Sequence, residues 1–315
     1  MAPCDALWDG DARILMYHGI TTCAAFDGVT NYYRYNVPAT EFAEQLAFLH
    51  EHCNVISLAS LRTAAGLSRT KANVVLSFDD GYENNYTVAF PLLKRYGMPA
   101  VFALPTAFVC DREPLWNDAV EYAVNHSAKE RVSFTWDGPP REFSLTDATG
   151  RVSLNKWLLD ELVRVEQGRR DELASIAIDT LGVTAAGHDL FRHEDYRPLT
   201  PEQISELAAS GSIEFASHSI HHYLLSKLDA AARRIELRES KRQIERVTGR
   251  PCTALCMPGG AYDDDVLRDA FSSGYEVVLT SKTGRAVPGA GVLNRNVVRH
   301  RVSMEKFAEV VHRAR

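Results

Sequence analysis

Six short apolar runs constrain the fold of this chain of 315 residues more than any other feature of its sequence. They lie at residues 13–17, 74–78, 100–104, 213–216, 254–257 and 276–279. Helical patterns at 39–52, 87–96, 200–210 and 229–248 lie between them, and the last three end at glycine, the residue favoured at helix C-termini. This alternation predicts an α/β protein whose parallel strands form a barrel or an open sheet, with functional groups at the carboxyl ends of the strands.

The stretch 111–195 interrupts the alternation. It contains a turn at 138–140 and amphipathic segments at 156–165 and 170–181, but few strand-like runs of its own. We interpret it as an insertion that packs on the barrel, so that residues 1–315 form a single catalytic domain.

The charge and hydropathy of the chain exclude two classes of function. The net charge is -6 and the pI is about 6.0, and no run of Lys and Arg forms the basic stripe that a nucleic-acid surface needs. No apolar run approaches the ~20 residues needed to span a bilayer, and the residues before Arg13 lack the features of a secretory signal. We therefore expect a cytoplasmic protein with no nucleic-acid partner.

Two adjacent carboxylates follow the second apolar run. Asp79 and Asp80 precede Gly81, at the carboxyl end of the strand predicted for 74–78. Two anions this close repel each other unless a cation lies between them or one is protonated. The alternative is an ordinary turn, where Asp and Gly are also favoured.

A pair of histidines follows the run at 213–216. His218 and His222 are four residues apart, so in a helical turn they would share one face, which is a common arrangement of transition-metal ligands. Together with one aspartate they would supply three ligands and leave a coordination position open, as in catalytic zinc sites. The other aspartate could then accept a proton from water. The sequence does not decide which of Asp79 and Asp80 has which role.

A third polar segment follows the run at 254–257. Pro258, Gly259 and Gly260 form a loop whose backbone N–H groups could bind a developing oxyanion. A plain turn explains the same residues equally well.

These three segments resemble the motifs of the polysaccharide deacetylase family, carbohydrate esterase family 4. The segment 77–81 is similar to its first motif, 218–222 to its His-Ser/Thr-x-x-His motif, and 258–260 to its third motif. The resemblance implies a distorted (β/α) barrel of about seven strands. It also implies Asp79 as the base, the amide of Gly259 as the oxyanion donor, and Asp80, His218 and His222 as ligands of a divalent metal, with Zn²⁺ the default.

The sequence departs from the family pattern in the third motif. Its arginine, which orients the base, is replaced by Cys256 or Met257, so this partner of the base is either missing or supplied from elsewhere. Arg295 and Arg299 are the candidates to substitute for it. Its aromatic residue is Gly259, which we expect to open that side of the pocket.

The acid motif of the family near the C-terminus is also absent. The leaving amine still needs a proton, and the candidates for the general acid are His18, His300 and His312. We favour His18, because it follows the strand predicted for 13–17 and should emerge at the same barrel face as the metal ligands.

Segments 15–19, 42–49 and 116–118 resemble the bacterial branch of the family that modifies lipopolysaccharide or exopolysaccharide. The implied activity is removal of N-acetyl groups from a nucleotide- or lipid-linked acetamido sugar, with peripheral membrane association through the substrate. The expected substrate contacts are Trp116, Asp118, Tyr262 and Arg295, although Trp116 and Asp118 could equally anchor the insertion. Two alternatives are a non-catalytic carbohydrate-binding relative and an oxygen-using iron enzyme, since two histidines and one carboxylate also describe the iron facial triad.

Overall fold

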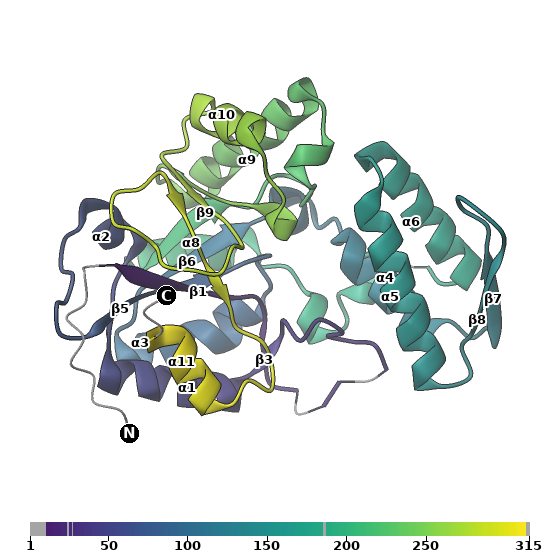
Figure 1. Cartoon of the computed structure of the whole chain (residues 1–315), viewed down its shortest axis with the longest axis horizontal. Coiled ribbons are helices and arrows are strands. Elements are labelled where there is room, and N and C mark those ends of the chain that lie inside the picture. Colours follow the sequence, from purple (N-terminus) through teal and green to yellow (C-terminus); the bar gives the residue numbers. More distant parts are fainter. Residues whose placement is uncertain (1–10, 24, 27, 185–186, 313–315) are drawn as a thin grey trace.

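A computed structural model describes residues 11–23, 25–26, 28–184 and 187–312 (Figure 1). All six predicted strands are present, and they belong to one curled sheet in which every strand pair is parallel. The order is β12-β11-β10-β9-β6-β5-β1-β13, with β4 paired to β5 beside this path. The predicted α/β class and distorted barrel are confirmed, but the sheet has nine strands rather than about seven.

The additional strands are short, which explains why the sequence did not reveal them. The sheet consists of β1 (Ala12–Tyr17), β4 (Cys53–Val55), β5 (Ala72–Phe78), β6 (Ala100–Leu104), β9 (Ile213–Ser217), β10 (Ala254–Cys256), β11 (Val277–Leu279), β12 (Val292–Leu293) and β13 (Asn296–Val297). A run of two or three residues is too short for a period of two to be recognised.

One segment near the C-terminus bridges the two ends of the sheet. Strands β12 and β13 lie at opposite ends of the strand order, yet only Asn294 and Arg295 separate them in the chain. The Thr280 N–H donates to the Leu293 carbonyl (2.9 Å), and the Val298 N–H donates to the Met16 carbonyl (2.9 Å). The segment therefore pairs with β11 at its start and with β1 at its end, and Arg295 lies at the closure.

The strands are buried on both faces, as parallel strands in a barrel must be. Val74, Leu76 and Phe78 of β5 belong to the larger hydrophobic cluster, which also contains residues of the surrounding helices. Val75 belongs to a second cluster, drawn from most strands of the sheet and from α2 (Leu58–Thr63). Because strand side chains alternate, the side chains of residues 77 and 79 leave β5 on the same side as Val75.

Helices cover the sheet at the predicted places. They are α1 (Ala39–His52), α3 (Phe90–Tyr96), α8 (Pro201–Ala209) and α9 (Ala230–Thr248), while α10 (Asp264–Ser272) and α11 (Met304–His312) were not predicted. Helix α8 begins with a capping box between Thr200 and Gln203. The pattern at 87–96 differs from the prediction, because its first part is a π-helix, Asn85–Ala89.

The insertion forms a lobe of its own, at the right of Figure 1. It contains α4 (Trp116–His126), α5 (Ala148–Arg164), α6 (Gln167–Leu181) and a hairpin of β7 (Arg131–Phe134) and β8 (Arg141–Ser144). Its apolar side chains form a hydrophobic cluster separate from those of the barrel. The short elements α7 (Gly187–Leu190) and η3 (Glu194–Tyr196) lead the chain back, and a small sheet of β2 (Ile20–Thr21) and β3 (Val37–Pro38) lies before α1. Among the described residues, no helix has the length and hydropathy needed to cross a bilayer.

The packing around β6 gives a test of the core. Phe102 is 1% exposed, and its ring lies 5.1 Å from that of Phe78. We expect Phe102→Ala to lower the free energy of unfolding by about 3–5 kcal/mol, measured by chemical denaturation, because it leaves a cavity between β5 and β9. Val287→Ala is the control, since that side chain is 54% exposed. A loss below about 1 kcal/mol for Phe102→Ala would contradict this account of the core.

Candidate metal centre and active site

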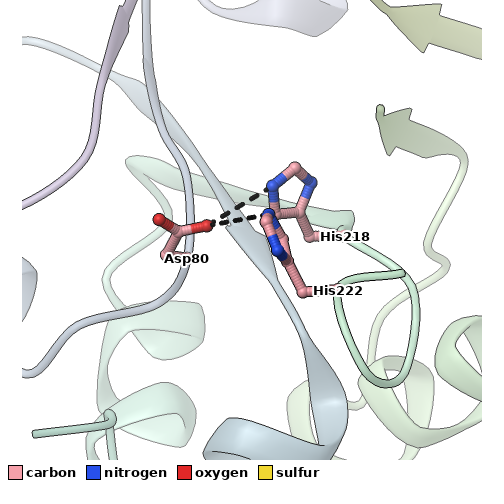
Figure 2. Close-up of side chains that lie close together, drawn as sticks. All are labelled: Asp80, His218 and His222. Carbon is pink, nitrogen blue, oxygen red and sulfur yellow. Dashed lines mark ion pairs between the residues drawn. The ribbon is translucent and has the colours of Figure 1, made fainter. Parts of the chain in front are cut away.

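Three side chains converge at the carboxyl ends of β5 and β9. Asp80 follows β5, while His218 and His222 follow β9. Figure 2 shows one Asp80 oxygen facing both imidazoles, and Oδ1 lies 3.5 Å from Nε2 of each histidine. One ligand atom from each residue lies within 4.8 Å of the others. Asp80, His218 and His222, predicted as metal ligands, are thus brought together.

The chemistry of these three groups fits a divalent cation. Asp80 Oδ1 is buried and has no hydrogen-bond partner among the described residues, although a buried carboxylate oxygen requires a donor or a cation. His218 Nδ1 lies 2.8 Å from the Cys256 carbonyl oxygen, which leaves Nε2 with a free lone pair. Burial lowers the pKa of His222 to about 4, so its imidazole is neutral, as a ligand must be.

The histidine loop does not have the predicted shape. No helical turn forms between His218 and His222, and Ser219 (φ 64°) and His222 (φ 57°) adopt left-handed conformations instead. The carboxylate of Glu236, on α9, accepts hydrogen bonds from the backbone N–H groups of Ile220 (2.8 Å) and His221 (3.1 Å). It also lies 2.6 Å from His221 Nδ1. Glu236 therefore shapes the loop and binds His221, which points away from the metal site.

Asp79 is held by a buried ion pair. Arg295 Nη1 donates to Asp79 Oδ1 (2.6 Å) and Nη2 donates to Oδ2 (2.8 Å). Although burial alone would raise the pKa of Asp79, the positive charge of Arg295 brings it below its ordinary value. Asp79 is therefore ionised at neutral pH and held at a fixed orientation, 3.8 Å from His218 Nε2.

Arg295 thus binds Asp79, as the missing arginine of the third motif was expected to do. Arg299, the other candidate, lies elsewhere. The Arg295 guanidinium has no exposed surface, and its Nε donates to the Thr280 carbonyl. Its burial does not support the substrate contact that we predicted for it. Arg299 is exposed and lies over the ring of Tyr35.

A cavity opens beside these groups. Its lining includes the three candidate ligands together with Asp79, His18, Gly259 and Asp118. Of the histidines considered as the acid, only His18 lines it. His300 lies 3.0 Å from Glu41 outside this cavity, and the ring of His312 lies 5.8 Å from that of Phe48, against α1.

His18 lines the cavity, and one of its ring nitrogens, Nδ1, has no hydrogen-bond partner among the described residues. Its ring stacks on that of Tyr35 at 4.3 Å. Burial lowers the pKa of His18 below its ordinary value, although Asp80 and Asp79 oppose this shift.

Gly259 lines the cavity in a conformation that suits glycine (φ 59°). A Cβ at this position would lie 2.3 Å from Leu224 Cδ2. We expected the glycine to open this side of the pocket, and this is wrong, because Leu224 occupies the space into which a larger side chain would extend.

Of the four predicted substrate contacts, only Asp118 lines the cavity. The Tyr82 hydroxyl donates a hydrogen bond to the Asp118 carboxylate (3.0 Å). Burial raises the pKa of Asp118 well above its ordinary value. Trp116 packs in the insertion with Arg170 over its ring at 5.1 Å, and Tyr262 lies beneath Lys282 at 4.8 Å. Trp116 therefore anchors the insertion, which was the alternative to its predicted contact with the substrate.

Sequence reasoning missed the residues that form the far wall of the cavity. Glu121, one turn after Asp118 on α4, accepts hydrogen bonds from the backbone N–H groups of Asn31 (2.9 Å) and Tyr32 (3.2 Å) and from the Tyr196 hydroxyl (2.9 Å). Burial raises the pKa of Glu121 to about 7. These partners are 75 to 90 residues away in the chain, so no local pattern indicates them.

Comparison with known proteins agrees with this geometry. The family model for polysaccharide deacetylase matches residues 67–143 and 177–278, more than half of the chain. The chain belongs to the polysaccharide deacetylase family. Bacillus subtilis (strain 168) YxkH, which is named for this family, is 23% identical over 289 residues, 91% of this chain and 70% of that protein. The poly-beta-1,6-N-acetyl-D-glucosamine N-deacetylase of Escherichia coli K12 is 39% identical over 71 residues, 22% of this chain and 11% of that protein.

Solved structures of deacetylases share the fold. Streptococcus pyogenes deacetylase PplD aligns with a TM-score of 0.61 at 19% identity, covering 96% of this chain and 98% of that one. IcaB from Ammonifex degensii aligns with a TM-score of 0.59 at 16% identity, covering 96% and 95%. At these identities the similarity shows a shared fold, and not a shared substrate.

The converging ligands predict the metal content of the protein. We expect about one divalent metal per chain, and His218→Ala or His222→Ala should lower the metal retained after dialysis on the order of ten-fold or more. Metal is measured by inductively coupled plasma mass spectrometry. His126→Ala is the control, because that histidine is exposed and its Nδ1 lies 2.9 Å from the Tyr122 carbonyl oxygen of the same helix, away from the cavity. Full occupancy in the double variant His218→Ala/His222→Ala would refute the ligand assignment.

Proposed function

We propose that this chain is a metal-dependent hydrolase that removes N-acetyl groups from an acetamido sugar during surface-polysaccharide biosynthesis. The observation that carries the proposal is the three-ligand set of Asp80, His218 and His222, open to a cavity in which the ionised Asp79 lies beside it. Structural metal sites are closed by four protein ligands, whereas catalytic sites keep a position open. Membership of the polysaccharide deacetylase family supports the same reaction class.

The metal chemistry follows from the ligands. When held by Asp80, His218 and His222, a divalent cation such as Zn²⁺ supplies Lewis-acid chemistry, which lowers the pKa of water and polarises the acetyl carbonyl. Two imidazoles and one carboxylate are ligands typical of zinc.

The residues of the chain divide the proton transfers between them. Asp79, oriented by Arg295, accepts a proton as water attacks the acetyl carbon. The backbone N–H of Gly259 donates to the carbonyl oxygen as negative charge develops on it. The C–N bond then breaks, and His18 donates a proton to the leaving amine. The products are acetate and the free amino sugar, and the PplD structure was itself solved with acetate.

The setting of the reaction is part of the same proposal. We place the reaction in the cytoplasm, on a nucleotide- or lipid-linked sugar, with contact to the membrane only through a lipid-linked substrate. Asp118 contributes to sugar binding, because it lines the cavity and its raised pKa favours a protonated, hydrogen-bonding form.

The experiment that tests the proposed function is acetate release. The metal-loaded protein is incubated with a panel of N-acetylated nucleotide sugars and lipid-linked glycans, and free acetate is measured. Retained metal without acetate from any of them would favour the non-catalytic carbohydrate-binding alternative. Activity that is lost only under anaerobic conditions would indicate the iron alternative.

Replacing Asp79 and replacing Asp80 should have different effects on metal binding and activity. Asp79→Asn removes the proton acceptor but no ligand, so metal should remain while kcat falls about 100-fold or more. Asp80→Ala removes a ligand, so metal affinity and activity should fall together and recover partly in excess metal. If Asp79→Asn is metal-free after dialysis while Asp80→Ala keeps its metal, the roles are reversed.

The position of His18 predicts the alkaline limb of the pH profile. A general acid must be protonated, so activity should fall as pH rises through the pKa of His18. Because burial lowers that pKa, the limb should lie below the ordinary histidine range. His18→Ala should lower kcat about 100-fold and remove the limb, while the control His300→Ala should keep both. The reverse result would assign the acid to His300, and no effect of either would exclude both histidines.

A further inference from the structure

Three arginines surround a groove beside the deacetylase cavity. Arg34 lies in the loop between β2 and β3, and Arg299 and Arg301 lie in the loop between β13 and α11. All three are exposed, and none forms an ion pair with a carboxylate of the described residues. The cluster is notable because the chain as a whole carries a net charge of -6. Unpaired guanidinium groups gathered at one place indicate a site for an anion.

The two loops are held together by the backbone. The His300 N–H donates to the Arg34 carbonyl (2.8 Å), so the two loops meet directly. Arg34 (φ 59°) and Arg301 (φ 62°) both adopt left-handed conformations, which are uncommon for side chains of this size. Glu41 accepts a hydrogen bond from the Arg301 N–H (3.1 Å) and lies 3.0 Å from His300 Nδ1. The nearby carboxylate thus fixes the loop and leaves the guanidinium groups free.

The groove adjoins the cavity and shares lining residues with it. Tyr33 and Arg299 line both, and the groove extends from them past Tyr32, Arg34 and Arg301. The Arg299 guanidinium lies 5.1 Å over the ring of Tyr35, which in turn stacks on His18. Tyr33 and Arg299 therefore form the boundary that the cavity and the groove share, and the arginines lie on the groove side of it.

We propose that this groove binds the phosphate or diphosphate of a phospho-linked acetamido sugar, an inference that rests on the proposed function. Guanidinium groups bind phosphate oxygens through paired N–H groups, and tyrosine rings pack on sugar faces. A neutral polysaccharide would leave the three charges unpaired. Burial raises the pKa of Tyr33 to about 12, and the negative charge of Asp160 adds to this shift. Asp160 is itself paired with Lys156 at 2.6 Å, so it contributes little net negative charge to the groove.

Binding of phosphate compounds tests the groove apart from catalysis. The probes are UDP and farnesyl diphosphate, with a neutral N-acetylglucosamine tetramer for comparison, titrated calorimetrically into the metal-loaded protein. Arg34→Gln/Arg301→Gln should weaken binding of both diphosphates about ten-fold or more and leave binding of the tetramer unchanged. Arg299→Gln provides a second variant from the same groove, with the same expected direction.

A matched control removes two positive charges elsewhere. Arg69 precedes β5 and Arg250 precedes β10, so both lie at the amino ends of parallel strands, opposite the active-site face, and both are exposed. Arg69→Gln/Arg250→Gln should bind the diphosphates as the unsubstituted protein does. Equal weakening in the control, or unchanged diphosphate binding in both groove variants, would overturn the proposal.

Acetate release then separates the two sources of phosphate. UDP-N-acetylglucosamine and farnesyl-diphosphate-linked N-acetylglucosamine are compared with the tetramer by kcat/KM. Preference for the first indicates a nucleotide sugar and preference for the second a lipid-linked sugar, and either preference, if lost in the groove variant, supports the proposal. Equal or greater turnover of the tetramer, insensitive to Arg34→Gln/Arg301→Gln, would overturn it.

The two parts of the experiment keep the proposals distinguishable. Diphosphate binding that depends on the arginines, without acetate from any substrate, would refute the deacetylase function and keep the groove as an anion site. Acetate release without diphosphate binding would keep the function and refute the groove.

Discussion

The ion pair between Asp79 and Arg295 joins the chemistry of the site to the closure of the barrel. Asp79 leaves the end of β5 toward the inside of the sheet, and Arg295 lies between the two short strands that bridge its ends. Both side chains are almost completely buried, so neither charge is tolerable without the other. The same contact fixes the orientation of the proposed base and leaves Asp80, the next residue, free to face the two histidines.

The insertion contributes the opposite side of the site. Asp118 and Glu121 extend from α4 toward the barrel, where one binds the Tyr82 hydroxyl and the other binds the backbone of residues 31 and 32. The loop that Glu121 holds continues into Tyr33, Arg34 and the ring of Tyr35. The lobe with its own hydrophobic core therefore helps to shape the cavity wall and the arginine groove, while the barrel supplies the candidate metal ligands and the proposed base.

Much of the barrel and the ligand set could be predicted from sequence, because both depend on local patterns. Six apolar runs indicated six strands, and Asp80, His218 and His222 converge because carboxyl ends of parallel strands share one edge. The histidine loop could not be predicted, since its left-handed residues depend on Glu236 from another helix. Spacing likewise could not choose Arg295 over Arg299, or show that Leu224 fills the space beside Gly259, because these contacts join distant segments.

The closure by two-residue strands has a consequence for synthesis of the chain on the ribosome. The partners of the ion pair are 216 residues apart, so Asp79 is translated long before Arg295 exists. Until the segment that contains Arg295 leaves the exit tunnel, the sheet remains open at β1 and β11, and the Asp79 carboxylate can keep its charge only in contact with water. Asp79 therefore acquires its partner only when β12 and β13 dock, and a ribosome-bound intermediate lacks the oriented carboxylate of the folded protein.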